Sequence, residues 1–368
     1  MKITVLQSNL AKALNQVAKI VGSRTTLPVL NNILLNAEKG KIKISATDLE
    51  VGISTQTIGK IEEEGSITLP AKLLLDFVMN NKDESVEIST KEMAAALKSS
   101  RFEATIHGIS ADEFPSVPEA PKEYLAVFPK NELFESLKKV AIAPATDETR
   151  PVLAGIYFQF SGRELTLAAT DSFRLAEKKI ELKSEVADSK VIIPTRTINE
   201  VIRVASSNES EEIALALTEN QASFKIGETY IVSRLIEGAF PNYAQIVPAT
   251  FKIETKTKAV DLTAAVRMTS LFSRDSANNN VKITVNKDGL DIASAASQVG
   301  TAKSHVLAEV KGEGLEIAFN ARYVLEVLNV VSDPEIMLNF NDSTSPAVVK
   351  LASDKGYTYI IMPLKSED

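Results

Sequence analysis

The chain alternates between two hydrophobic periodicities, one typical of helices and one typical of half-buried strands. Leu10, Leu14 and Val17 recur at helical spacing and predict an amphipathic helix near the start of the chain, with Ser8 or Asn9 as its N-cap. A second face of this helix carries the polar residues Lys12, Gln16 and Lys19.

The same helical stripe returns twice further along the chain. Leu133, Leu137 and Val140 form the second stripe, and Leu262 with Val266 forms a weaker third one, which Asp261 is placed to cap. Between the helices, residues 41–46 and 164–168 alternate as half-buried antiparallel strands do, and residues 39–40 and 288–289 are typical hairpin turns.

Three further helices are predicted at a constant step. Pro70, Pro194 and Asn320 stand at their starts, 124 and then 126 residues apart. Each of these helices places a base two residues in and an acid four residues later, which predicts surface pairs on one helical face. The three pairs are Lys72 with Asp76, Arg196 with Glu200, and Arg322 with Glu326.

Other landmarks keep the same step, so the chain is one unit repeated three times. The segment 46–48, Ala-Thr-Asp, reappears at 169–171, and the Phe-Pro pair at 114–115 reappears at 240–241. The third copy diverges most, with Ala295-Ala296 at the Thr-Asp positions. The expected fold class is α+β, with two helices and antiparallel sheets in each repeat.

Two linker-like segments of the sequence predict the domain boundaries. A Pro-rich link covers residues 113–121, and a second junction covers 242–249. The expected domains are residues 1–121, 126–247 and 250–368, called repeats 1, 2 and 3 below. Each has about 120 residues, enough for its own core.

Composition limits the chemistry that the chain can perform. Among 368 residues there is no cysteine and there are two histidines, His107 and His305, which leaves little for thiol, imidazole or metal chemistry. We expect no cofactor, no metal and no catalytic residue. No apolar run is long enough to span a membrane, and the first residues enter a strand pattern without a signal core, so the expected compartment is the cytoplasm.

The net charge of -7 argues against an ordinary DNA-binding surface, because phosphate binding draws on clustered Lys and Arg. A ring avoids this objection, since topological linkage needs only weak contacts. If neighbouring sheets join edge to edge, three repeats form an arc with two open edges, and a head-to-tail dimer closes it. Twelve helices spaced at roughly 8–10 Å would then line a hole of about 20–28 Å, wide enough for duplex DNA.

Several residues admit two interpretations. Asp48 and Asp171 could be an acid–base pair, but their equivalent places in two repeats favour two separate turn caps. Ser136 to Lys139 matches an S-x-x-K pattern without its companion motif. The helix bases could be a solvated face, and Leu153, Leu175 and Met362 could be plain core. The rival functions are an α+β enzyme on a triplicated scaffold and a scaffold protein that never binds DNA.

The whole chain resembles the bacterial DNA polymerase III beta subunits, the β sliding clamps. The most specific stretches are residues 26–32 (TLPVLNN), 46–50 (ATDLE), 169–175 (ATDSFRL) and 319–325 (FNARYVL). The resemblance implies a head-to-tail homodimeric ring around duplex DNA that gives the replicative polymerase its processivity. The implied partners are the polymerase alpha subunit, the ATP-driven clamp loader and other proteins with clamp-binding motifs. The implied location is the nucleoid, without membrane association.

The resemblance also implies three sets of site residues. Partner peptides dock in a pocket between repeats 2 and 3, made of Leu153, Thr170, Ser172, Arg174, Leu175, Pro241, Ile246, Asn320, Tyr323, Thr344, Ile360, Met362 and Leu364. The residues that face DNA are Arg24, Lys72, Arg150 and Arg196. The dimer seam brings Phe102 and Ala104 to Leu271 and Phe272 of a second copy.

The chain departs from the pattern of its relatives at a few positions. Phe173 stands where many relatives have His, and Pro346 where a small polar residue is common. Ala104 is smaller than usual, which suggests a looser seam. Residues 365–368 extend past the usual end and add acidic charge beside the pocket, which could retune peptide binding.

Overall fold

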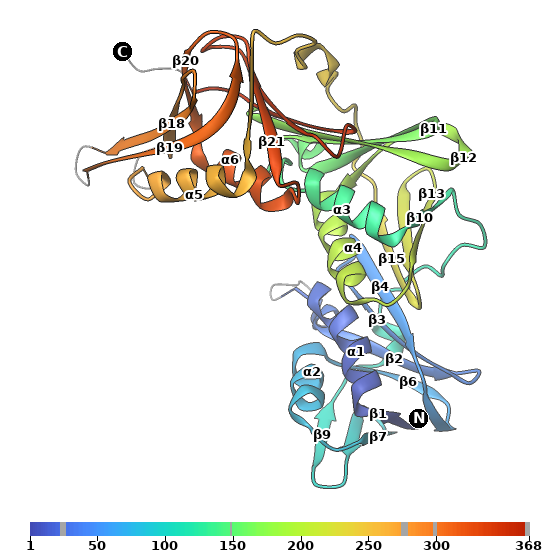
Figure 1. Cartoon of the computed structure of the whole chain (residues 1–368). Coiled ribbons are helices and arrows are strands. Elements are labelled where there is room, and N and C mark those ends of the chain that lie inside the picture. Colours follow the sequence, from blue (N-terminus) through green and yellow to red (C-terminus); the bar gives the residue numbers. More distant parts are fainter. Residues whose placement is uncertain (23–26, 148, 274–278, 297–299, 365–368) are drawn as a thin grey trace. The chain divides into compact units, whose positions relative to one another are not determined.

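A computed structural model describes residues 1–22, 27–147, 149–273, 279–296 and 300–364. The chain forms two compact units (Figure 1). Unit 1 holds residues 1–134 and 196–235, and unit 2 holds residues 135–195 and 236–368. Among the described residues, no helix is both long and apolar enough to cross a membrane.

Unit 1 contains a five-stranded and an eight-stranded antiparallel sheet. The first has the order β5-β1-β7-β8-β9 and the second the order β10-β13-β14-β15-β4-β3-β2-β6. Its helices are α1 (Gln7–Val17), α2 (Ala71–Asn80), the start of α3 (Lys130–Val140) and most of α4 (Thr195–Ser207). Its strands are β1 (Lys2–Leu6), β2 (Asn32–Glu38), β3 (Lys41–Thr47), β4 (Val51–Thr57), β5 (Gly59–Glu63), β6 (Gly65–Pro70), β7 (Ser85–Lys91), β8 (Ala94–Lys98), β9 (Glu103–His107), β10 (Ala126–Pro129), β13 (Glu212–Leu217), β14 (Gln221–Ile226) and β15 (Thr229–Arg234).

Unit 2 contains a ten-stranded sheet in the order β11-β12-β23-β22-β21-β16-β19-β18-β17-β20. Helices α5 (Ala259–Ser270) and α6 (Ala321–Val330) lie next to each other beside it (Figure 1). Its strands are β11 (Gly155–Thr170), β12 (Arg174–Pro194), β16 (Ile253–Lys258), β17 (Asn280–Val285), β18 (Gly289–Ala296), β19 (Gly300–Lys311), β20 (Leu315–Asn320), β21 (Glu335–Phe340), β22 (Ala347–Leu351) and β23 (Tyr357–Ile361). Short 3₁₀ turns occur at 18–20, 28–31, 111–113, 151–153 (η4) and 243–246 (η5).

The predicted helical stripes are the faces that the core buries. Leu10, Leu14 and Val17 of α1 are fully buried, as are the α3 residues Leu133, Leu137 and Val140. Helix α1 packs on α2 and on strands β3 and β4. The helices therefore form because burial of one apolar face stabilises them, as the periodicity predicted.

Neighbouring repeats join through continuous sheets, as the open-edge argument expected. In unit 1, β15 of repeat 2 pairs antiparallel with β4 of repeat 1, with Thr229 opposite Thr55. In unit 2, β23 of repeat 3 pairs with β12 of repeat 2, with Arg174 opposite Ile361. We call these pairings junction 1 and junction 2.

Two backbone hydrogen bonds recur in all three repeats and show that the repeats are equivalent folds. In each repeat, the N–H of the first residue of the first helix donates to a carbonyl in the loop after the second helix, directly before the next strand. The three bonds run from Gln7 to Glu84, from Lys130 to Glu211 and from Ala259 to Pro334. After the last strand of each repeat, Ile109 donates to Thr68, Ile236 to Ile192 and Leu364 to Ala318.

Several local predictions were wrong. Helix α1 begins at Gln7, so neither Ser8 nor Asn9 caps it, and α5 begins at Ala259, which places Asp261 inside the first turn. Gln16 is buried, not on a polar face. By contrast, the third copy carries Ala295-Ala296 at the Thr-Asp positions, as predicted, because Val285 pairs with Leu290 as Ala37 pairs with Ile42.

The helix-surface pairs follow the prediction in only one of three helices. Arg322 and Glu326 form the expected i,i+4 pair at 2.7 Å. In α4, Arg196 pairs with Asp48 and Glu200 pairs with Arg203. Among the described residues, no ion pair joins Lys72 to Asp76. Tertiary partners have replaced the local ones.

Candidate functional site

A tight turn with the sequence Thr-Asp ends strand β3 in repeat 1 and strand β11 in repeat 2. The Asp171 carboxylate accepts hydrogen bonds from the backbone N–H groups of Phe173 and Arg174, at 2.9 and 3.0 Å. Asp48 does the same for Glu50 and Val51. Ser172 and Leu49 share a left-handed φ of 79°. The two aspartates are therefore turn caps, as predicted.

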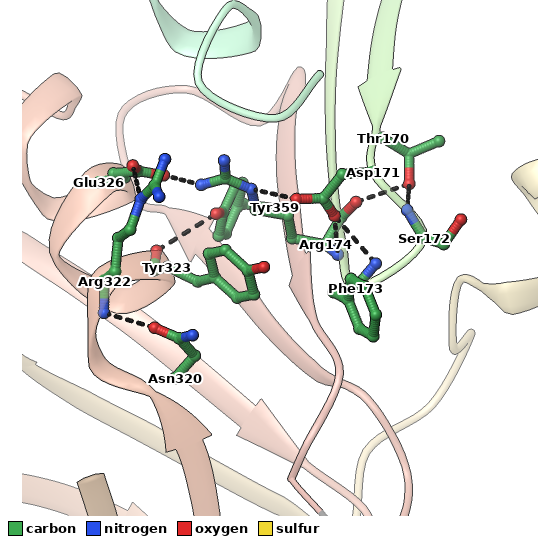
Figure 2. Close-up of polar contacts among 10 residues, drawn as sticks. All are labelled: Thr170, Asp171, Ser172, Phe173, Arg174, Asn320, Arg322, Tyr323, Glu326 and Tyr359. Atoms are coloured by element: carbon green, nitrogen blue, oxygen red, sulfur yellow. Dashed lines mark hydrogen bonds and ion pairs between the residues drawn. The ribbon is translucent and has the colours of Figure 1, made fainter. Parts of the chain in front are cut away.

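Arg174 is the centre of a buried charge network in unit 2. Its side chain is 4% exposed. Figure 2 shows its guanidinium between two carboxylates, Asp171 at 3.0 Å and Glu326, with which it forms an ion pair. The second oxygen of Glu326 accepts from Arg322 at 2.7 Å. The order along the network is Asp171, Arg174, Glu326, Arg322.

The network at junction 1 is shorter, but its two end residues are equivalent to Asp171 and Arg322. There Asp48 pairs directly with Arg196, which occupies the second position of α4 as Arg322 does in α6. The position of Arg174 is Val51 in repeat 1, because both follow the aspartate by three residues. Glu200 of α4 corresponds to Glu326 of α6, so Arg174 is the added residue, and its ion pair with Glu326 has no equivalent between Val51 and Glu200 at junction 1.

Aromatic side chains surround this ion pair. The Arg174 guanidinium lies 4.5 Å from the centre of the Tyr323 ring, and the Tyr359 hydroxyl donates to the Tyr323 carbonyl at 3.2 Å (Figure 2). Burial raises the pKa of Tyr359 to about 12, against the opposing effect of Arg174, so this phenol stays protonated. Burial also raises the pKa of Tyr323.

Next to the network, apolar side chains pass from buried to exposed. Leu175, Val348 and Ile360 form a buried cluster, against which Tyr243, Val247 and Phe251 pack. Met362 donates its backbone N–H to the Phe173 carbonyl at 2.8 Å, and the Met362 and Phe173 side chains are 36% and 58% exposed. An apolar ligand could bury these two side chains beside an already formed apolar wall.

The structure brings together most of the predicted pocket residues. Thr170 and Ser172 form the turn, with the Thr170 hydroxyl donating to the Arg174 carbonyl at 2.6 Å, and the Asn320 side chain caps α6. Leu175 and Ile360 lie in the cluster. Leu153 is buried in η4, which starts after Arg150, and Arg150 donates to Ser172 at 3.0 Å.

The other pocket residues are less closely tied to this group. Leu364 is fixed by its backbone hydrogen bond to Ala318, and Ile246 is 48% exposed at the end of η5. Thr344 lies in a turn that the Asp342 carboxylate holds, directly before Pro346. No hydrogen bond, ion pair or ring contact among the described residues joins Thr344 or Pro241 to the cluster.

The predicted DNA-facing residues differ in how free their charges are. Lys72 is exposed on α2. Arg196 is 52% exposed but is already paired with Asp48 and donates to the Ile20 carbonyl. Arg150 lies beside the Thr-Asp turn, as described above. Arg24, like the tail 365–368, lies outside the described residues.

The predicted seam residues are surface residues of their own units. Phe102 is 48% exposed directly before the edge strand β9, and Ala104 is within it. Leu271 is 41% exposed directly after α5, and Phe272 follows it at intermediate exposure.

Sequence reasoning missed Glu326 and Tyr359 as parts of the site. Arg174 itself was the available signal, because a base within an alternating strand needs a buried acid nearby. The identity of that acid depends on the fold, since Glu326 lies far along the chain. Among the described residues, no group of three or more His, Asp or Glu side chains is placed to hold a metal ion.

Comparisons with known proteins agree with this fold. Three family models match in order: the N-terminal, central and C-terminal domains of the DNA polymerase III beta subunit, over residues 1–118, 127–242 and 244–365. The Beta sliding clamp of Synechococcus elongatus is 34% identical, with 99% of each chain covered. That of Staphylococcus epidermidis is 29% identical over the full length of both.

Solved structures show the same similarity. The sliding clamp of Bacillus subtilis superimposes with a TM-score of 0.94 at 27% identity, covering 100% of this chain and 99% of that one. A Pseudomonas aeruginosa sliding clamp bound to griselimycin gives a TM-score of 0.93 at 28% identity, over the full length of both.

Three repeats joined by continuous sheets, with the relatives just described, define a sliding clamp, the processivity-factor class of replication proteins. Within that class, the chain belongs to the family of bacterial DNA polymerase III beta subunits.

Proposed function

We propose that two copies of this chain close head to tail into a ring around duplex DNA, and that the Arg174 site tethers partner peptides to it. The partners are the replicative polymerase alpha subunit, the clamp loader and other proteins that carry clamp-binding motifs. The protein itself is not an enzyme, and it acts in the cytoplasm, on nucleoid DNA. The observation that carries the proposal is the pattern of strand edges.

The paired edges at junctions 1 and 2 have counterparts that are free in the described chain. β9 corresponds to β15 and β23, because each is followed by the same recurring backbone hydrogen bond. Yet β9 has a strand neighbour on one side only, β8. The first half of β19 corresponds to β4 and to the start of β12. It pairs with β18 on one side, and its other side is free because β16 pairs with β19 only from Ala308 onward. The free edges complement each other.

The internal repeat predicts the register of this third junction. Ile231 lies opposite Ile53 at junction 1, and Tyr359 lies opposite Ala176 at junction 2. Counting from the recurring hydrogen bonds and from the strand pairings, the equivalent residues of the free edges are Ala104 and Ala302. We therefore expect Ala104 of one copy to lie opposite Ala302 of the other.

Disulfide crosslinking tests this junction cleanly, since the chain has no cysteine of its own. Directly opposite residues in an antiparallel pair have Cα atoms about 4.5–5.5 Å apart, within the range that a disulfide spans. In the A104C/A302C double variant, mild oxidation should give covalently closed dimers. The control A104C/L307C, with one cysteine well out of register, should not crosslink efficiently. Monomers only, or an open ladder of higher oligomers, would contradict the closed dimer.

The tethering role draws on the exposed apolar side chains beside Arg174. A peptide that buries Met362 gains roughly 25 cal/mol per Å² of apolar surface, and Leu175 supports the wall beneath it. We expect Met362→Ala to weaken binding of a polymerase-derived peptide at least about tenfold. Titration by fluorescence anisotropy measures this. Met268→Ala, a matched change at an exposed α5 position, should bind as the original chain does. Unchanged affinity of the Met362 variant would place the pocket elsewhere.

The proposed DNA contacts include basic residues on two helices, Lys72 on α2 and Arg196 on α4. Lys72, Arg196, Arg150 and Arg24 are the proposed interior bases. Arg196 should contribute less than Lys72, because Asp48 already offsets its charge. Weak contacts of this kind suit a ring that slides.

A further inference from the structure

The start of the first helix is built alike in the three repeats, with one difference in side chain. Gln7, Lys130 and Ala259 each begin their helix and donate the recurring backbone hydrogen bond described above. In repeat 1, the Gln7 amide also donates to the Val78 carbonyl in the last turn of α2, at 2.6 Å. In repeat 2, the Lys130 ammonium donates to the Asn208 carbonyl just after α4, at 2.7 Å.

Repeat 3 has no such side chain. Ala259 has only a methyl group at this place, so it cannot reach the end of α6. The acceptor that corresponds to Val78 is the Leu328 carbonyl, because both residues are the eighth of a ten-residue helix. Among the described residues, no side chain donates a hydrogen bond to the last-turn carbonyls of α6.

An open groove occupies the position of the missing side chain. Its volume is about 740 Å³, and its apolar walls include Ala259, Val260, Leu328, Val331 and Pro334. Val260 is 69% exposed beside it. Charged side chains of both signs also line the groove, so no net charge repels a cation.

We infer that this groove binds a lysine side chain of a partner polypeptide, whose ammonium replaces the missing donor at the end of α6. The carbonyl end of a helix carries partial negative charge, which favours an ammonium over a neutral amide. The groove is several times larger than one side chain and falls within the range of sites for larger ligands, which favours a peptide segment over a free amine. This site is separate from the Arg174 site, and its test does not depend on the proposed function.

The probes are N-acetyl-Ala-Lys-Ala-amide, its norleucine analogue and butylamine, titrated into the full chain with methyl-labelled Val and Leu. The lysine peptide should shift the methyl signals of Val260, Leu328 and Val331. The norleucine analogue should bind about tenfold or more weakly, because it lacks a charge-assisted hydrogen bond. Butylamine should also bind more weakly, since it lacks the backbone. Equal binding of the norleucine peptide, or tighter binding of butylamine, would overturn the inference, as would no shift from the lysine peptide.

Variants exchange the side chain between repeats. A259Q and A259K rebuild the arrangement of repeats 1 and 2, and either should abolish the peptide shifts, whereas Met268→Gln on the same helix should leave them unchanged. The converse variant, Q7A, should open a second groove and gain a binding event with new shifts at Val78. Retained binding in both A259 variants, or no gained binding in Q7A, would contradict a site defined by the missing donor.

Discussion

At the scale of single residues, Arg174 shows how one buried charge ties two repeats together. Its guanidinium contacts carboxylates from its own turn and from α6, at 4% exposure. Taking these charges out of water is costly, and only the close pairing offsets that cost. Arg322 contacts the same Glu326 from the surface, at 61% exposure, where water screens the pair. The two arginines therefore share a partner but differ in burial.

This difference gives a matched prediction. Arg174→Met should lower the free energy of unfolding by about 3–5 kcal/mol, because it leaves the largely buried Asp171 carboxylate without its counter-charge and Glu326 with only the exposed Arg322. Arg322→Met should cost below about 1 kcal/mol. Urea denaturation followed by circular dichroism measures both. Similar losses in the two variants would show that burial of Arg174 is not what makes its pairs matter.

Some of these residue-scale features were predictable and others were not. The Asp48 and Asp171 caps followed from the sequence because their partners are two and three residues away. Arg174 entered the site through family resemblance alone. The burial of Gln16 was missed because its partner Thr229 lies 213 residues away, and no local pattern contains that contact.

At the scale of elements, the two junctions use different chemistry at equivalent positions. At junction 1, the Thr55 hydroxyl contacts Gln16 at 3.1 Å and Thr229 at 3.0 Å, and all three side chains are buried and neutral. The positions of Gln16 and Thr55 are taken in repeat 2 by Lys139 and Lys178, each 123 residues further along. Both lysines pair with Asp354, at 2.7 and 2.6 Å, with exposures of 12–17%. Junction 2 is therefore the charged one.

Junction 2 should consequently be sensitive to loss of one carboxylate. Asp354→Asn leaves two largely buried ammonium groups without a partner, so hydrogen exchange of the β23 amides should become easier by about 3–5 kcal/mol. Thr55→Val at junction 1 should cost about 1 kcal/mol for the β15 amides, because Gln16 and Thr229 still bond to each other. Equal effects at the two junctions would contradict the assignment.

The pH dependence of junction 2 has a definite sign. Burial alone would raise the pKa of Asp354, but hydrogen bonds and charge from Lys139 and Lys178 outweigh it and hold the pKa below the ordinary 3.8. A carboxyl with a lowered folded pKa contributes stability above its unfolded pKa, and that stability is lost as pH falls through the folded value. Protection of β23 should fall below about pH 4 in the original chain and stay flatter in the Asn variant.

Element positions were predicted better than element ends. The apolar stripes located α1 and α3, because core burial governs both the pattern and the helix. The N-caps failed because α1 and α5 begin directly at the end of a preceding strand, where Leu6 and Lys258 occupy the cap position without a capping side chain. Here the strand geometry and the recurring backbone hydrogen bond set the helix start.

At the scale of the whole molecule, the proposed function depends on closure of two copies into a ring. The free edges of β9 and β19 have paired counterparts at both junctions, so a second copy completes a pattern that the chain already repeats. The proposed ring would hold a chain with a net charge of -7 on DNA, because encirclement needs no strong phosphate contacts. The repeat was visible in the sequence. The register of the third junction required the strand pairings.

The most direct test of this account is retention on circular against linear duplex. The protein is loaded by its clamp loader onto a nicked circle, separated from free protein by gel filtration, and the circle is then cut once with a restriction enzyme. The account predicts that the protein stays with the intact circle through the column and leaves the cut DNA within the time of the assay. Equal retention on both forms would mean that the protein holds DNA by surface contacts, and the encircling ring would be wrong.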